Sequence, residues 1–416
     1  MKLMNNITFK NTAIGLIPSD WEVKKLGEIG ELKNGINKDK DEFGFGFPMV
    51  NLMDVFGISR VFKNNLKLGL VNANERDIKD FSLQKGDVLF IRSSVKPSGV
   101  GLTTLICDDL ENTTYSGFII RFRDNGYLNF EYKAHCFFDE NFRKRLLNKS
   151  TISANANINQ GALNSLKLPI PPLPEQQKIA SILSTWDKAI DNCKGIIEEL
   201  KIRNKGLTQK LLTGKMRVKG FEKATWSLVP IKTIAKDSSK KNPNNKDLVV
   251  LSCTKYNGLV PSLEYFGRKI YSDDLTTYKI VSKGQFAYAT NHIEEGSIGY
   301  QSSYDEALIS PMYTVFQTDE TVNDNFLFRV LKSTNYIHEY QKRMEGSIDR
   351  RGGLRWDEFS KIKVPNPELK EQLEIVEILD KATEELNQYQ QKLETLQLQK
   401  KGLMQQLLTG KKRVKI

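Results

Sequence analysis

Polar side chains that can bind phosphates and base edges gather in four short stretches, Arg92–Gly99, Ser153–Gln160, Thr290–His292 and Arg350–Arg355. Guanidinium, ammonium and hydroxyl groups bind phosphates, whereas asparagine and glutamine amides can pair with adenine through two hydrogen bonds. Loops are polar wherever they are solvated, so the alternative for each single residue is an ordinary surface position. The candidate recognition residues are Arg92, Ser93, Ser94, Lys96, Ser98, Asn155, Asn157, Asn159, Gln160, Thr290, Asn291, His292, Arg350, Arg351 and Arg355.

Motifs for catalysis and metal binding are missing from the sequence. The Gly-Lys pairs at 214–215 and 410–411 lack the upstream glycine and the hydroxyl residue of a phosphate-binding P-loop. There is no Gly-x-Gly-x-x-Gly after a strand and no Asn-Pro-Pro-Tyr, the motif by which amino-methyltransferases hold an extruded base. His135, His292 and His338 show no metal-ligand spacing. We therefore predict no catalytic and no metal-ligating residue in this chain.

Two copies of one long helical pattern would position these loops. Residues 169–213 begin P-I-P-P-L-P-E-Q-Q, and residues 365–415 return the pattern from P-N-P-E-L-K-E-Q-L without a gap, since 371 − 175 = 196 and 410 − 214 = 196. Apolar residues recur with steps of three and four, which predicts coiled-coil helices of about 38 residues, about 55 Å long. The predicted helix-pairing residues are Leu183, Trp186, Ile190, Ile197, Leu200, Leu207, Leu379, Leu386, Tyr389, Leu393, Leu396 and Leu403.

Charge indicates how the two helices pair. Residues 201–219 carry seven Lys or Arg and no acid, whereas residues 368–385 carry seven acids and two lysines. Parallel helices would bring their basic ends together, but antiparallel helices set the basic end of the first against the acidic start of the second. Acids early and bases late also suit each helix dipole, which explains part of the gradient. We expect an antiparallel pair.

Composition sets the broad class. The chain of 416 residues is 39% hydrophobic, is long enough for two to four domains and has a net charge of +12, which favours an anionic partner. Half of that excess lies in residues 166–221, with 11 bases and 5 acids, so any nucleic-acid surface on the globular parts must be a local face. Four cysteines without a Cys-x-x-Cys pair, and no long apolar run, predict a soluble cytoplasmic protein.

The rest of the chain follows a repeated plan of globule, helix, globule and helix. Trp21 and Trp226 stand near the starts of the two globules, and Lys283–Tyr288 parallels the buried strand pattern of Lys85–Ile91. The Gly/Phe-rich stretch Phe43–Phe47 is expected to be a loop. The predicted divisions are residues 1–165 and 216–361 for the globules, and 166–215 and 362–416 for the helices.

Several stretches resemble the specificity subunit of type I restriction-modification enzymes. They are I-P-S-D-W-E-V-K-K-L around Trp21, K-G-D-V-L-F-I-R-S-S from Lys85, L-P-I-P-P-L-P-E-Q-Q-K-I, and the repeated L-L-T-G-K. The resemblance covers essentially the whole chain. It departs in the second helix, where Asn366 and Lys370 stand in a P-N-P-E-L-K-E-Q-L that replaces P-P-L-P-E-Q-Q.

The resemblance implies an α/β or α+β protein with a pseudo-two-fold repeat, in which two target-recognition domains are separated by long antiparallel coiled-coil helices. Each domain would read one half of a bipartite, asymmetric site in double-stranded DNA, and the helices would set the spacer and dock two methyltransferase subunits. S-adenosylmethionine, Mg²⁺ and ATP would belong to the methyltransferase and restriction/translocase partners, with no membrane involved. The residues leave open a non-catalytic coiled-coil scaffold whose two binding modules are not specific for DNA.

Overall fold

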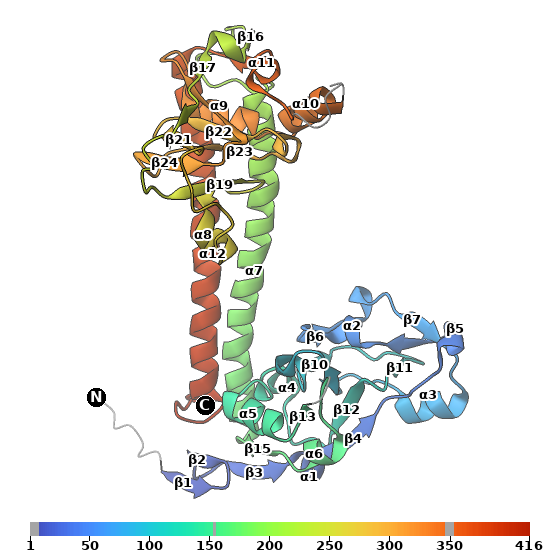
Figure 1. Cartoon of the computed structure of the whole chain (residues 1–416). Helices are drawn as coiled ribbons and strands as arrows, with labels where there is room; N and C mark the ends of the chain where they lie inside the picture. Colours follow the sequence, from blue (N-terminus) through green and yellow to red (C-terminus); the bar gives the residue numbers. More distant parts are fainter. Residues whose placement is uncertain (1–7, 153–154, 346–352) are drawn as a thin grey trace. The chain divides into compact units, whose positions relative to one another are not determined.

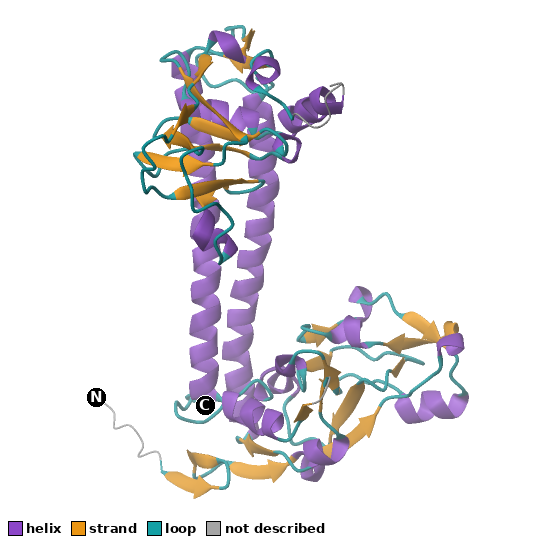
Figure 2. Ribbon diagram, viewed as in Figure 1, coloured by secondary structure: helices purple, strands orange, loops and turns teal. Residues whose placement is uncertain are grey.

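The computed structural model describes residues 8–152, 155–345 and 353–416. The chain forms two compact units. The first unit comprises Met1–Lys194 and Gln391–Ile416, and the second comprises Gly195–Gln390. Each unit contains one globular domain of strands and short helices together with a part of both long helices (Figures 1 and 2).

The first domain is built on a five-stranded sheet of order β4-β12-β8-β10-β6. All four side chains of its central strand, the apolar run Val-Leu-Phe-Ile, are buried, as expected for a strand covered on both faces. The strands are β4 (Gly30–Asn34), β12 (Ile119–Asp124), β8 (Val88–Ile91), β10 (Thr103–Ile106) and β6 (Arg60–Val61).

A three-stranded sheet of order β11-β5-β7 lies in the same domain. It consists of β11 (Thr114–Tyr115), β5 (Phe43–Val50) and β7 (Gly69–Val71). The expectation of a loop over Phe43–Phe47 was wrong, because β5 pairs with β7 across a bulge between Phe43 and Phe47. Gly44 and Gly46 adopt φ values of +100° and +92° there, which only glycine takes without strain.

The second domain contains a four-stranded sheet and a five-stranded sheet. Their orders are β17-β25-β22-β23 and β18-β21-β24-β19-β20. The first consists of β17 (Ala235–Asp237), β25 (Tyr313–Thr318), β22 (Phe286–Ala289) and β23 (Ile298–Tyr300). The second consists of β18 (Lys240–Lys241), β21 (Lys279–Ser282), β24 (Glu306–Ile309), β19 (Val250–Thr254) and β20 (Gly258–Pro261).

The two domains share one plan although their sequences have diverged. In the first, β12 lies antiparallel between β4 and β8, and in the second, β25 lies antiparallel between β17 and β22. The strand that precedes each long helix also has an equivalent partner. β15 (Lys167–Ile170) pairs with β3 (Glu22–Lys25), and β26 (Lys363–Asn366) pairs with β16 (Ser227–Pro230). The predicted internal repeat therefore holds in the structure.

The long helices are α7 (Leu173–Leu212) and α12 (Leu369–Leu407), and they run antiparallel in each unit (Figure 1). In the first unit Lys400 pairs with Asp187. In the second unit Arg203 pairs with Glu385 at 2.7 Å, and the side-chain amide of Asn204 donates to the carbonyl of Ala382 at 2.6 Å. The predicted fold, two globular domains with two long antiparallel helices, is confirmed.

The helix-pairing positions are buried or half-buried. Leu183, Ile190, Ile197, Leu200 and Leu379 are buried, and Trp186, Leu207, Leu386, Tyr389, Leu393, Leu396 and Leu403 are half-buried. Two polar seam positions break the apolar pattern, and both make specific contacts, Asn204 with Ala382 and Lys400 with Asp187. A polar seam residue fixes helix register. None of the described helices is long and apolar enough to cross a membrane.

Candidate nucleic-acid interface

In the first domain the two predicted recognition stretches meet in one small sheet. β8 ends at Ile91, and β9 (Ser93–Ser94) pairs antiparallel with β14 (Ala156–Asn157), which pairs in turn with β13 (Thr151–Ile152). The N–H of Ile158 also donates to the carbonyl of Arg92 at 2.9 Å. Residues more than 60 positions apart in the chain therefore form one surface.

Several of the predicted side chains hold this surface together. The Arg92 guanidinium donates to the carbonyl of Gly117 at 3.2 Å, and the Gln160 amide donates to the carbonyl of Leu32 at 2.5 Å. The Asn159 oxygen accepts from the N–H of Ala162 and so caps the short helix α6 (Gln160–Asn164). Ser94 is buried, and Ser93 is half-buried beside it.

Other predicted side chains of the first domain face solvent. Lys96, Ser98 and Asn155 are exposed, and Asn157 is half-buried with its amide donating to the carbonyl of Asn155 at 3.0 Å. An ammonium, a hydroxyl and two side-chain amides on these segments can bind phosphates and base edges.

The second domain brings its predicted stretches together in the same way. The N–H of Leu354 donates to the carbonyl of Thr290 at 2.9 Å, the equivalent of the Ile158–Arg92 bond. Gly353 makes this approach possible, since a Cβ atom there would lie 2.5 Å from both the Thr290 carbonyl and the Asn291 side-chain oxygen. Arg355 is exposed at the start of α11 (Trp356–Phe359). The predicted residues Arg350 and Arg351 lie outside the described residues.

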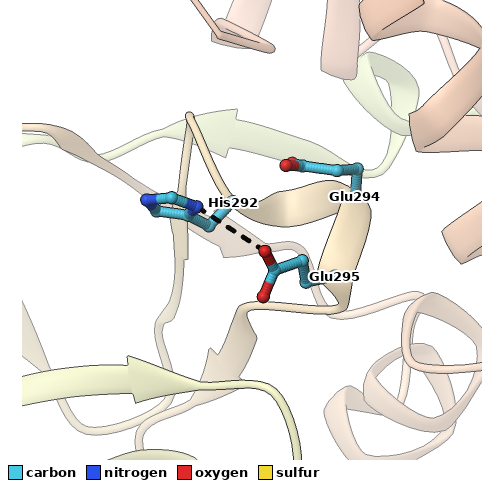
Figure 3. Close-up of side chains that lie close together, drawn as sticks. All are labelled: His292, Glu294 and Glu295. Carbon is cyan, nitrogen blue, oxygen red and sulfur yellow. Dashed lines mark ion pairs between the residues drawn. The ribbon is translucent and has the colours of Figure 1, made fainter.

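His292 stands beside two carboxylates that sequence reasoning did not connect with it (Figure 3). Its Nδ1 lies 4.0 Å from a Glu295 oxygen, and the ligand atoms of His292, Glu294 and Glu295 all lie within 4.8 Å of one another. His292 and Glu295 are exposed and already paired, so the cluster by itself does not define a metal centre. Carboxylates repel phosphates but accept hydrogen bonds from the cytosine amino group. This loop is therefore better suited to a base edge than to the DNA backbone.

A buried glutamate at the start of α7 ties three segments of the first unit together. Glu175 is fully buried and accepts from the Trp21 indole at 2.8 Å and from the Arg413 guanidinium at 2.6 and 2.8 Å. Arg413 also binds both oxygens of Asp20, and these two carboxylates raise the pKa of Arg413. The guanidinium in turn lowers the pKa of the Asp20 carboxyl. This cluster fastens the segment after α12 to the start of α7.

The second unit repeats the cluster with the helices exchanged. Glu371, at the start of α12, accepts from the Trp226 indole at 2.9 Å and from the Arg217 guanidinium at 2.8 and 2.9 Å. Arg217 follows α7 as Arg413 follows α12, and its pKa is raised by the hydrogen bonds to Glu371. We call the two clusters the Trp-Glu-Arg clamps. Each joins the start of one repeat to the end of the other.

The glutamine next to each clamp glutamate binds the domain itself. Gln176 accepts from the N–H of Asn129 at 2.8 Å, and its amide donates to the carbonyls of Tyr127 and Pro171. Gln372 makes the equivalent bonds with Asn323, Thr321 and Pro367. The Pro-x-x-x-Glu-Gln motif, from Pro171 to Gln176 and from Pro367 to Gln372, therefore anchors each domain to its helix. The departure at Asn366 and Lys370 leaves these contacts intact.

His135 is a buried neutral group of the first unit. It is 2% exposed on α4 (Phe130–Cys136), with Ser184 at 3.4 Å and Asp187 at 3.8 Å on α7. Burial, aided by the charges of Lys400 and Arg60, lowers the pKa of His135 to about 3. The unfolded chain therefore binds a proton that the folded chain excludes between about pH 3 and pH 6.5.

We predict that the first unit loses about 2 kcal/mol of unfolding free energy through His135 between pH 7 and pH 5, at about 1.4 kcal/mol per pKa unit. His135→Gln should reduce this acid sensitivity, because a neutral amide takes no proton. Urea denaturation at both pH values is the measurement, with the exposed His338→Gln as matched control. Equal acid sensitivity in the wild type and in His135→Gln would contradict the prediction.

The family model for the type I restriction modification DNA specificity domain matches residues 18–202 and 226–397. The chain belongs to this family. The two matched ranges correspond to the two repeats, and each includes one globular domain and most of the long helix that follows it.

Relatives within the specificity family span the whole chain. A putative type I restriction enzyme MjaX specificity subunit from Methanocaldococcus jannaschii is 28% identical over 98% of this chain and 97% of that protein. The MjaVIII specificity subunit of the same organism is 26% identical, covering 96% and 94%. The HsdS subunit structure from Thermoanaerobacter tengcongensis has a TM-score of 0.55 at 16% identity, covering 94% and 96%.

A solved structure of the type I restriction-modification system, which concerns complex assembly and conformational transition, has a TM-score of 0.56 at 14% identity. The match covers 95% of this chain and 99% of that chain. At these identities the structural likenesses show the fold of the specificity family alone. That fold agrees with the two-domain, two-helix architecture described above.

Proposed function

We propose that this chain is the DNA-reading subunit of a type I restriction-modification system. Each globular domain reads one half of a bipartite, asymmetric site in double-stranded DNA, and the long helices set the spacing between the halves. The observation that supports this best is the convergence of two distant polar stretches at the same place in both domains, with different side chains in each. Because the two domains carry different side chains at equivalent positions, their half-sites should differ in sequence.

The chain acts without catalysis of its own in this proposal. Methyl transfer and cleavage, with S-adenosylmethionine, Mg²⁺ and ATP, are assigned to methyltransferase and restriction partners that meet the chain and its DNA in the cytoplasm. The absence of P-loop, Asn-Pro-Pro-Tyr and metal-spacing motifs from the sequence supports this division. The divisions at residues 165, 215 and 361 stay a prediction.

The outer faces of the long helices offer a docking site for the methyltransferase subunits. Ile202 on α7 and Leu398 on α12 are 74% and 72% exposed, and they occupy the same repeat position. Four residues on, hence on the same helix face, stand Gly206 and Gly402, where an added Cβ would meet nothing within 4 Å. A mid-helix glycine costs about 1 kcal/mol relative to alanine, so its use at both positions suits the close approach of a partner helix.

The test is binding of the purified chain to duplex DNA. Methylation mapping of the host genome supplies the motif, and the chain should bind that duplex about 10³-fold or more tightly than an unrelated one. Its affinity should fall as salt rises, since phosphate contacts release counterions. The same preparation should transfer no methyl group. A scaffold that is not specific for DNA would show no salt-dependent binding and no preference for the motif.

A further inference from the structure

A tight serine turn is repeated in the two domains next to the candidate recognition residues. In the first domain the Ser116 hydroxyl accepts from the N–H of Phe118 at 3.2 Å. In the second the Ser310 hydroxyl accepts from the N–H of Met312 at 3.3 Å. Both pairs are related by the same offset, since 310 − 116 = 194 and 312 − 118 = 194. Phe118 and Met312 therefore occupy one structural position.

Each turn is bonded to a residue predicted to read DNA. The N–H of Arg92 donates to the carbonyl of Phe118 at 2.8 Å. The hydroxyl of Thr290 donates to the carbonyl of Met312 at 2.9 Å. The N–H and the carbonyl of both Phe118 and Met312 are therefore hydrogen-bonded, which fixes the backbone position from which each side chain extends.

Both side chains are large, apolar and open to solvent. Phe118 is 58% exposed and Met312 is 57% exposed. Single exposed apolar residues are common on protein surfaces. Here, however, the equivalent position carries an exposed apolar residue in both domains. In both domains this residue lies next to the candidate recognition residues. Met312 also lines a cavity of about 450 Å³ together with Thr290 and Arg355.

We propose that Phe118 and Met312 are the apolar base-contacting residues of the two domains, each packing on a thymine methyl group in its own half-site. The 5-methyl group of thymine is the apolar group that base edges present in the major groove, where an apolar side chain distinguishes it from the polar edges. A flat ring in one domain and a flexible thioether in the other suit two different base contexts. The inference rests on the proposed function.

The experiment uses the full chain with its modification subunits and the duplex that carries its mapped motif. Phe118→Ala should weaken binding to this duplex about tenfold, from the loss of one base contact. Met312→Ala should do the same through the other half-site. Binding to unrelated DNA and the salt dependence should not change, because no charge is removed. Leu16→Ala and Leu228→Ala, which are 67% and 64% exposed in the same two domains, are the matched controls.

A second arm needs no mutant. Thymines of the motif are replaced one at a time by deoxyuridine, which removes only the methyl group. One position in each half-site should weaken wild-type binding about tenfold. The uridine at that position should not weaken the binding of Phe118→Ala any further, because the side chain that contacts the methyl group is already gone. The same should hold for Met312→Ala and the uridine in the other half-site.

Each result decides a separate point. Wild-type binding that is specific and unaffected by every uridine overturns the methyl contact and leaves the proposed function standing. If Phe118→Ala or Met312→Ala weakened binding to the motif and to unrelated DNA equally, the methyl contact would also be overturned. Wild-type chain that shows no preference for the motif overturns the proposed function itself.

Discussion

Replacing Glu175 with alanine is expected to lower the unfolding free energy of the first unit by about 3 to 5 kcal/mol. The carboxylate is fully buried and accepts from both the Trp21 indole and the Arg413 guanidinium. Its removal leaves a buried donor unpaired and takes away one of the two carboxylates that bind Arg413. Urea denaturation followed by hydrogen exchange, read separately on peptides of the two units, measures the effect.

Two controls make this result specific. Glu198→Ala removes an exposed carboxylate that pairs with Lys201 on α7, and it should cost less than about 1 kcal/mol. Glu371→Ala should shift the loss to the second unit, because its clamp contains Trp226 and Arg217. If Glu175→Ala destabilised no more than Glu198→Ala, the clamp would contribute little to holding the unit together.

Assembly with the modification subunit should be lost when both docking positions are charged. Ile202→Asp combined with Leu398→Asp is expected to weaken the complex about 100-fold or more, as for a buried interface anchor. Each single variant should leave a complex with one modification subunit, because the repeat provides two equivalent positions. Light scattering of the mixed proteins gives the stoichiometry, with Leu16→Asp as the control on another exposed apolar residue.

The neighbouring glycine gives this prediction a sharper form. Gly402→Ala should stabilise α12 by up to about 1 kcal/mol, since the added methyl group meets no neighbour. It should nevertheless weaken assembly, because that methyl group would fill the space for the partner helix. A variant that is more stable and assembles equally well would show that no partner approaches the helix there.

The long helices could be predicted from the sequence because their apolar periodicity is a local pattern and occurs in both repeats. The step of three and four residues and the opposed charges of 201–219 and 368–385 indicate an antiparallel pair without any tertiary information. The contacts of Arg203 with Glu385 and of Lys400 with Asp187 agree with that arrangement.

The recognition surface was harder to foresee because it depends on pairing between distant segments. Nothing local in Ser93–Ser94 indicates that it pairs with Ala156–Asn157. Nor does composition show that Asn159 and Gln160 bond to backbone atoms. The strand at Phe43–Phe47 was missed for the same reason. Glycine-rich sequence is typical of loops, and only the pairing with β7 makes this segment a strand.

The clamps were missed although a signal existed. Glu175, Gln176 and Arg217 all return 196 positions later as Glu371, Gln372 and Arg413. Glutamate and glutamine that keep their places in both copies, while the neighbouring Pro174 and Gln177 become Lys370 and Leu373, point to a shared contact. Which helix supplies the arginine could be known only from the structure, because each clamp exchanges residues between repeats.

The exchanged clamps set an order for folding during synthesis. The core of the first unit includes Leu407 and Leu408 together with Trp21, whereas the second unit is one continuous stretch, Gly195–Gln390. The domain that leaves the ribosome first therefore cannot complete its core until residues 391–416 have been made. At about 5 to 20 residues per second, that wait is about 10 to 45 s after residue 194. The second domain, although translated later, can be finished first.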